Sequence, residues 1–120
     1  MLAKNFIITL EVYPFDIMCS FGQTDEQLKK SLNKHHLIWD DMCKLRGNGK
    51  YVMFPCGASL IRMPYIPETN EDYGTLQHEI FHATTFILDK IGMEMSLYKS
   101  DEAYAYLIGW LTTKIYNKLC

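Results

Sequence analysis

Hydrophobic and polar positions along the chain follow two periods, one typical of strands and one typical of helices. Asn5–Tyr13 (NFIITLEVY) is rich in β-branched and aromatic residues, which predicts a strand that ends before Pro14. Phe15–Phe21 has a similar composition and predicts a second strand, closed by Gly22. The chain is therefore expected to begin with two strands.

A helical period follows these strands. Thr24 is suited to be the N-cap of a helix, and Gln27, three residues later, completes the sequence pattern of a capping box. Large side chains then recur at helical spacing, and Gly47-Asn48-Gly49 ends the segment, so one helix is predicted for this stretch. The recurring residues are Leu28, Leu32, His35 or His36, Trp39 and Met42.

Two further strands are predicted in the middle of the chain. Tyr51–Phe54 and Ala58–Met63 have strand-like compositions and are separated by Pro55-Cys56-Gly57, which favours a hairpin. Pro64 and Pro67 then indicate an irregular segment.

The last part of the chain has the pattern of two helices. Apolar residues at i, i+4 and i+7 predict a helix from about Glu71 to Ile91, and Gly92 stands where a glycine would end it. Ser100 is expected to cap a final helix that runs towards Lys118 and carries acidic residues in its first turn. The apolar positions of the first of these helices are Leu76, Ile80, Ala83, Ile87 and Ile91.

The order ββ-α-ββ-α-α predicts the α+β fold class. A length of 120 residues suits a single domain covering residues 1–120. The 48% apolar and 13% aromatic content supplies enough core material to exclude an intrinsically disordered chain.

Net charge, hydropathy and cysteine spacing indicate which partners and which cellular compartment to expect. A formal net charge of -2 predicts no general attraction to nucleic acid or to an anionic membrane surface. No stretch approaches the roughly 20 apolar residues of a membrane-spanning helix, and the first ten residues (MLAKNFIITL) lack the features of a signal peptide. The four cysteines form no CxxC pair, so free thiols in the cytoplasm are expected.

Residues 78–82 read His-Glu-Ile-Phe-His, the HExxH pattern, on the helix predicted from Glu71 to Ile91. His78 and His82 are four residues apart, so their imidazoles share a helix face and can bind one ion. Glu79 is rotated by roughly 100° from His78 and can approach a metal-bound water without being a ligand. Zinc suits such ligands and activates water, with Glu79 as the general base. The alternative is two surface histidines beside a solvated glutamate.

A third ligand is expected from elsewhere in the chain. The metzincin extension is absent, because Thr85 and Leu88 occupy its glycine and final histidine positions. Glu102 is the best-placed carboxylate, since it follows His82 by 20 residues and lies in the first turn of the next predicted helix. It could also serve only to stabilise the helix dipole. Rival ligands are Asp101, Asp89 and Glu94.

The stretch HEIFHATTFILDKIG followed by SDEAYAYLIGW resembles the gluzincin-type zincin metallopeptidases. It is most similar to the small zinc peptidases that tailed bacteriophages and prophages encode, and the likeness covers Thr75–Leu111. Tyr106 stands where several larger gluzincins carry an Asp. The resemblance implies a zinc peptidase located, if phage-encoded, in the host cytoplasm, with Glu79 as general base. The implied zinc ligands are His78, His82 and Glu102.

Further residues are candidates for substrate handling. Tyr106 lies one turn after Glu102, faces the same way and is the residue assigned as oxyanion stabiliser, the alternative being a core tyrosine with a satisfied hydroxyl. The strand Ala58–Met63 is expected either to pair with a substrate backbone at the sheet edge or to be an ordinary strand. The adjacent His35 and His36 are expected at the surface. The other oxyanion candidates are Tyr98, Tyr104 and Arg62.

The sequence thus predicts a zinc metallopeptidase that acts on a peptide or protein, with neither nucleic acid nor membrane as a partner. The alternative is a zinc-stabilised binding or regulatory protein without catalysis, and a third possibility is a scaffold that holds no metal. Glu79 distinguishes the first two, because a purely structural zinc site has no need of a general base.

Overall fold

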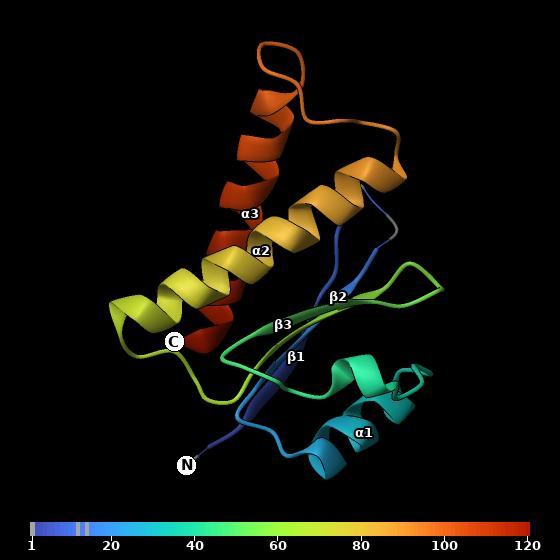
Figure 1. Ribbon diagram of the computed structural model, residues 1–120, viewed down its shortest axis with the longest axis vertical. Coiled ribbons are helices and arrows are strands. Elements are labelled where there is room, and N and C mark those ends of the chain that lie inside the picture. The colour runs from blue at the N-terminus through green and yellow to red at the C-terminus, as the bar shows by residue number, and fades with distance from the viewer. Residues whose placement is uncertain (1, 12, 14) are drawn as a thin grey trace.

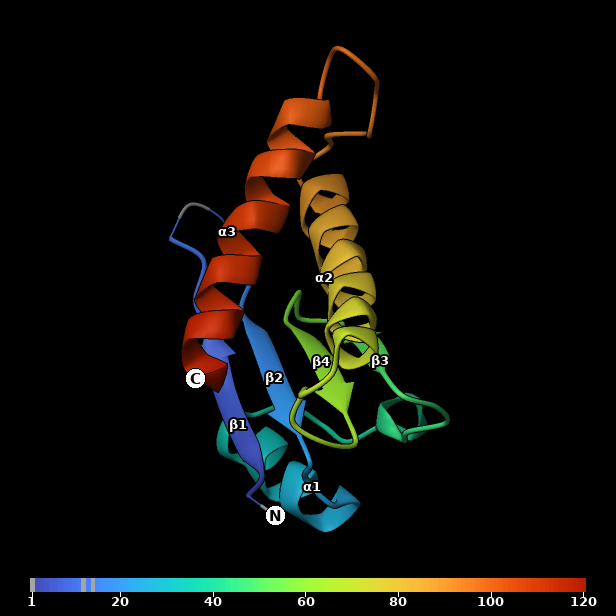
Figure 2. The same ribbon diagram turned by 90° about the vertical axis from the view of Figure 1, so that its left-hand side faces the viewer.

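The computed structural model describes residues 2–11, 13 and 15–120. Within them, a four-stranded sheet has α2 and α3 on one face and α1 on the other (Figures 1 and 2). The α+β prediction and its order of strands and helices are confirmed. The elements are β1 Lys4–Ile8, β2 Ile17–Phe21, α1 Asp25–Lys34, the 3-10 turn η1 Asp41–Cys43, β3 Lys50–Met53, β4 Ser59–Met63, α2 Asn70–Lys90 and α3 Asp101–Leu119.

The strands lie in the order β1-β2-β4-β3. β1 and β2 pair antiparallel, β2 and β4 pair parallel, and β3 and β4 pair antiparallel. The connection through α1 and β3 is long enough for the crossover that a parallel pair needs. Of the two interpretations of Ala58–Met63, the ordinary strand is confirmed and the sheet edge is wrong, because β4 is paired on both sides and all five of its residues are buried. On this side of the sheet the edge strand is β3.

Alternation along the strands divides the buried residues between two cores. One core lies between the sheet and the helices α2 and α3, and the other between the sheet and α1. The strand residues of the first core include Ile17, Cys19, Phe21, Ile61 and Met63, and those of the second include Met18, Val52 and Leu60.

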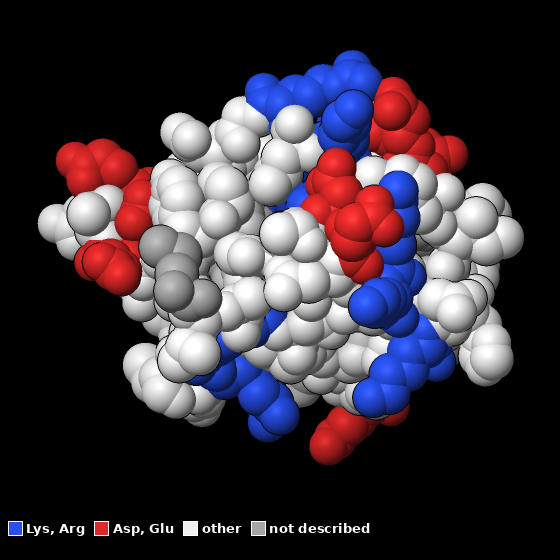
Figure 3. Space-filling model, turned by 90° about the horizontal axis from the view of Figure 1, so that it is seen from below, with Lys and Arg blue, Asp and Glu red and all other residues white. Residues whose placement is uncertain are grey.

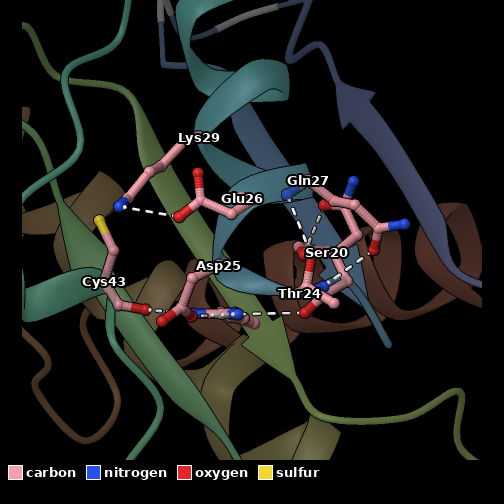
Figure 4. Close-up of polar contacts among 9 residues, drawn as sticks. Ser20, Thr24, Asp25, Glu26, Gln27, Lys29 and Cys43 are labelled. Carbon is pink, nitrogen blue, oxygen red and sulfur yellow. Dashed lines mark hydrogen bonds and ion pairs between the residues drawn. The ribbon is translucent and has the colours of Figure 1, made fainter.

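Helix α1 begins as predicted but ends early. Thr24 Oγ1 accepts a hydrogen bond from the Gln27 backbone N–H at 3.1 Å, and Gln27 Oε1 accepts one from Thr24 N at 2.9 Å, which confirms the capping box (Figure 4). The helix ends at Lys34 rather than near Gly47, so the single long helix is wrong. His36 adopts a φ of 60°, a left-handed conformation that turns the chain out of the helix. Of the side chains at helical spacing beyond this point, Trp39 packs against the core from a loop, whereas Met42 is exposed.

Helix α2 matches its predicted span, and its cap explains where it begins. Thr69 Oγ1 accepts from Asp72 N, and Asp72 Oδ2 accepts from Thr69 N, both at 3.1 Å. The Asp72 carboxylate also accepts a hydrogen bond from Glu68 N at 3.0 Å, and the backbone hydrogen bonds from Glu68 and Thr69 are the main causes that lower the pKa of Asp72. Gly92 follows the helix with a φ of +81°, as a glycine at that position permits.

Two sequence predictions about element ends are wrong. Ser100 precedes α3 but makes no side-chain cap; its hydroxyl donates to the Glu94 carbonyl and accepts from Ser96 N. The first strand ends at Ile8 rather than at Tyr13. Val12, within the predicted strand, and Pro14, which was expected to end it, lie outside the described residues, as does Met1.

Charged side chains on the α1 side of the molecule include both signs. Seen from below, Lys and Arg side chains lie beside Asp and Glu side chains over much of this face (Figure 3). One exposed pair, Lys29 Nζ and Glu26 Oε1, is 3.3 Å apart on α1. Exposed pairs of this kind contribute little stability. The burial of Leu28 and Leu32 against the sheet therefore holds α1 in place.

Arg62 is a buried structural residue on the α1 face of β4, with only 2% of its surface exposed. Its guanidinium donates to the carbonyls of Cys43 at 2.9 Å and Gln23 at 3.1 Å, and lies 2.9 Å from Asp25 Oδ1. Asp25 and Cys43 are brought together around this point (Figure 4). The sheet separates Arg62 from α2, so its candidacy as an oxyanion donor for the HExxH site is wrong.

Replacing Arg62 with methionine is expected to lower the free energy of unfolding by about 2–3 kcal/mol, because two buried carbonyls lose their donor. Urea unfolding followed by circular dichroism measures the change. The matched control is Asp25→Asn, which removes the charge from a partner that is 41% exposed and is expected to cost under about 1 kcal/mol. Equal losses in both variants would show that the ion pair, not the carbonyl contacts, stabilises this network.

Candidate metal centre

Helix α2 presents the two histidines of the HExxH motif to solvent and keeps its glutamate buried. Its buried stripe, which includes Leu76, Ile80 and Ala83, packs in the core that α2 and α3 share with the sheet. His78 and His82 are exposed, whereas Glu79 is only 6% exposed. The helical spacing therefore places two free imidazoles at the surface with a buried carboxylate between them.

The two imidazoles converge on one point. His78 Nε2 and His82 Nε2 are 3.1 Å apart. Two nitrogens bound to a tetrahedral zinc at ordinary bond lengths would be about 3.3 Å apart, so the pair is close to the required geometry. One ligand atom each from His78, Glu79 and His82 lie within 4.8 Å of one another. The cluster can hold a metal ion, and its donor set of imidazoles and a carboxylate suits zinc.

The edge strand β3 and the residue before it form the other wall of the site. Gly49, Lys50 and Tyr51 line a cavity of about 300 Å³ together with His78, Glu79 and His82. The Tyr51 ring stacks on the His82 ring, with 6.1 Å between centroids and 23° between planes. The sequence analysis missed Tyr51 and Lys50, because no local pattern shows that β3 lies beside α2.

Burial and charge act in opposite directions on Glu79. Removal from water raises the pKa of the Glu79 carboxyl above its ordinary value, while the positive charges of His78, His82 and Lys50 oppose the rise. A raised pKa makes the carboxylate a better proton acceptor near neutral pH. Burial also raises the pKa of Tyr51 to about 12, so its hydroxyl stays protonated.

Gly49 brings the backbone close to Glu79. A Cβ at position 49 would lie 2.8 Å from Thr75 Cγ2 and 2.9 Å from Glu79 Oε2, distances that real Cβ atoms do not tolerate. The absence of a side chain at this position therefore leaves the space that the Glu79 carboxylate occupies.

Gly49→Ala is expected to displace Glu79 and to lower the free energy of unfolding by about 1–3 kcal/mol, the usual cost of overpacking. Thermal or urea unfolding measures the effect. Gly47→Ala is the matched control, because a Cβ there meets nothing within 4 Å. The control is expected to change stability by less than about 1 kcal/mol. Equal behaviour of the two variants would contradict the close approach at Gly49.

The structure does not bring Glu102 or Tyr106 to the HExxH cluster. Both lie on the exposed side of the first turns of α3 and line a separate cavity of about 430 Å³ with Glu11, Tyr13 and Trp110. Helix α3 packs along a different side of α2, where Gln77 Nε2 lies 3.0 Å from Thr112 Oγ1. The start of α3 lies at the end of the molecule away from the sheet (Figure 1). The ligand role of Glu102 stays a prediction from the sequence.

The remaining candidates also lie outside the cluster. Tyr104 donates from its hydroxyl to the Met93 carbonyl at 2.7 Å, a contact that ties α3 to the loop before it. Tyr98 is 89% exposed in that loop. Among the described residues, the group that could hold a metal contains none of the rival carboxylates, Asp89, Glu94 or Asp101.

Comparisons with protein-family models, with curated proteins and with solved structures found no match to the chain. The likeness to zincins is therefore supported by the His-Glu-His cluster that could bind a metal, and by no relative. Within residues 2–11, 13 and 15–120, no helix has the length and apolar character needed to cross a bilayer.

Proposed function

We propose that this protein is a zinc-dependent hydrolase of peptide bonds, of the gluzincin type. His78 and His82 hold the zinc, and Glu79 is the general base. The observation that carries the proposal is the convergence of the two Nε2 atoms, 3.1 Å apart, beside a buried carboxylate. A zinc site that only stabilised a fold would not need this carboxylate poised next to the ligands.

Glu79 handles the proton in this reaction. When bound, zinc supplies Lewis-acid chemistry and lowers the pKa of water that it holds. The Glu79 carboxylate accepts a proton from the attacking water and delivers it to the leaving nitrogen, so that the released amine is neutral. The Gly49 backbone lies close to the Glu79 carboxylate and limits the space in which that carboxylate can move. Tyr51, stacked on His82, restricts the orientation of that imidazole.

The free edge of β3 offers a path for the substrate backbone. Phe54 N donates to the Ala58 carbonyl at 2.8 Å, so Phe54 and, by alternation, Val52 direct their backbone groups towards β4. Tyr51 and Met53 therefore direct their N–H and C=O groups to the outer edge. An extended peptide that pairs with Tyr51 would pass beside the His-Glu-His cluster.

Metal removal tests the proposal. The zinc-loaded protein is expected to cleave members of a mixture of capped peptides, to lose this activity in a chelator such as EDTA, and to regain it when zinc is restored. Mass spectrometry of the products measures cleavage. Zinc bound at one equivalent per chain without any cleavage would contradict the proposed hydrolase.

A second candidate is a zinc-stabilised binding protein without catalysis. Two observations favour it. Glu102 is separated from the His-Glu-His cluster, and Glu79 lies close enough to His78 and His82 to be the third zinc ligand. Under this alternative, Glu79→Gln would weaken zinc binding. Under the hydrolase proposal, the same variant retains zinc, so the metal content of this variant separates the two candidates.

A further inference from the structure

An apolar groove lies beside β3, on the α1 side of the sheet edge. It has a volume of about 620 Å³ and runs between the segment that follows α1 and the strand itself. We call it the 37–54 groove. The residues that define it are Leu37, Ile38, Trp39, Met42, Met53 and Phe54.

The rim of the 37–54 groove carries large apolar side chains in water. Ile38 is 82% exposed, Met42 is 59% exposed and Met53 is 57% exposed. The floor is buried, since Phe54 and its neighbour Val52 belong to the core beneath α1. Isolated exposed apolar residues are common, but several around one concave surface indicate a binding site.

The wall formed by the segment after α1 is held in place by backbone contacts. Leu37 N donates to the Leu32 carbonyl at 2.9 Å, which fixes the chain as it leaves the helix. Asp40 Oδ1 accepts from Met42 N at 2.8 Å and caps the turn η1. The Lys29 Nζ and Arg62 Cζ atoms lie 5.0 and 5.8 Å from the centroid of the Trp39 ring. A wall fixed in this way loses little conformational entropy when a ligand binds.

The 37–54 groove and the candidate metal centre lie on either side of the same strand, β3. Tyr51 lines both cavities, and the outward backbone groups of Tyr51 and Met53 lie along the edge between them. Side chains of an added strand would point alternately to the α2 face and to the α1 face of the sheet. A residue directed to the α1 face would enter the groove while the backbone continues past His82.

We propose that the 37–54 groove binds an apolar side chain of an extended peptide that pairs with β3. The free backbone edge selects a polypeptide over other apolar ligands, and the groove selects a residue such as leucine over a charged one. This assigns peptides with an apolar residue next to the cleaved segment as the substrate class. That last step rests on the proposed hydrolase function, whereas the binding itself requires neither zinc nor Glu79.

Binding is measured on the metal-free protein with the change Trp110→Phe, which leaves Trp39 as the single tryptophan. The probe is a capped oligothreonine peptide with one central leucine, and the control peptide has aspartate in its place. The leucine peptide is expected to change Trp39 fluorescence and to bind at least about tenfold more tightly than the control. Ile38→Asp and Met42→Asp are each expected to weaken it by about tenfold or more. Leu97→Asp, an equally exposed apolar position in the loop before α3, is the matched control and should have no effect.

Two results would overturn the inference: equal binding of the two peptides, or no binding of either. Methylation of alternate backbone nitrogens of the leucine peptide tests the pairing with β3, and unchanged affinity for every methylated peptide would also overturn it. The outcome is separable from that of the hydrolase proposal. Leucine-dependent binding without cleavage on addition of zinc contradicts only the hydrolase, and zinc-dependent cleavage without preference for leucine contradicts only the groove.

Discussion

Zinc binding is expected to be lost when either His78 or His82 is replaced with alanine. The two imidazoles converge at 3.1 Å in the cluster that could hold a metal ion, so each variant would lose one of the two proposed nitrogen ligands. Changes to outer partners of a ligand already weaken metal affinity by about 10- to 100-fold, and removal of a ligand costs more. Isothermal titration of the metal-free protein with zinc measures the loss.

The chain offers a matched control for these variants. His35 is exposed at the end of α1, on the other side of the sheet from α2, and His35→Ala should leave zinc affinity unchanged. Wild type is expected to unfold at higher temperature with zinc than without it, because the ion binds the folded chain. The histidine variants should not show this rise. Zinc affinity that survives both His78→Ala and His82→Ala would place the metal elsewhere and remove the basis of the hydrolase proposal.

Glu79→Gln is expected to lower the rate of peptide hydrolysis by about 100- to 10,000-fold while zinc affinity changes little. Glutamine fills the same buried space beside Gly49 but cannot accept a proton, so the loss reports general-base catalysis. Product formation under saturating zinc measures the rate, and elemental analysis of the same sample measures the metal content.

Two further variants serve as comparisons for Glu79→Gln. Glu71→Gln changes an exposed carboxyl on the same helix and should retain full activity. Glu102→Gln tests the sequence prediction that Glu102 is a zinc ligand. Retained zinc affinity agrees with the position of Glu102 in the second cavity, whereas lost affinity would identify it as a ligand. A Glu79→Gln protein as active as wild type would exclude Glu79 as the base.

Local patterns were sufficient for the elements whose ends are fixed by neighbouring residues. The capping box at Thr24, the span of α2 and the stop at Gly92 each depend on contacts within a few positions, and all are confirmed. The HExxH spacing likewise places His78 and His82 on one face of a helix, because four residues make slightly more than one helical turn.

Periodicity failed where a packed loop resembled a helix. Trp39 and Met42 continue the spacing of α1, yet His36 leaves the helical conformation and both side chains line the 37–54 groove. Helical spacing of apolar residues indicates only that their side chains face apolar surroundings. A loop folded onto a core can place side chains in such surroundings just as a helix can. The groove and its place beside β3 were therefore not visible in the sequence.

The sequence by itself determined the α+β class and the His-Glu-His cluster that could hold a metal ion. Only the tertiary structure decided which strand is the sheet edge, that Tyr51 and Gly49 enclose Glu79, and that Glu102 lies in a separate cavity. The physical reason is how far apart in the sequence the contacting residues lie. A helix sets the relation of residues four apart through its own hydrogen bonds, whereas the neighbours of β3 and of α3 depend on how distant segments share two cores.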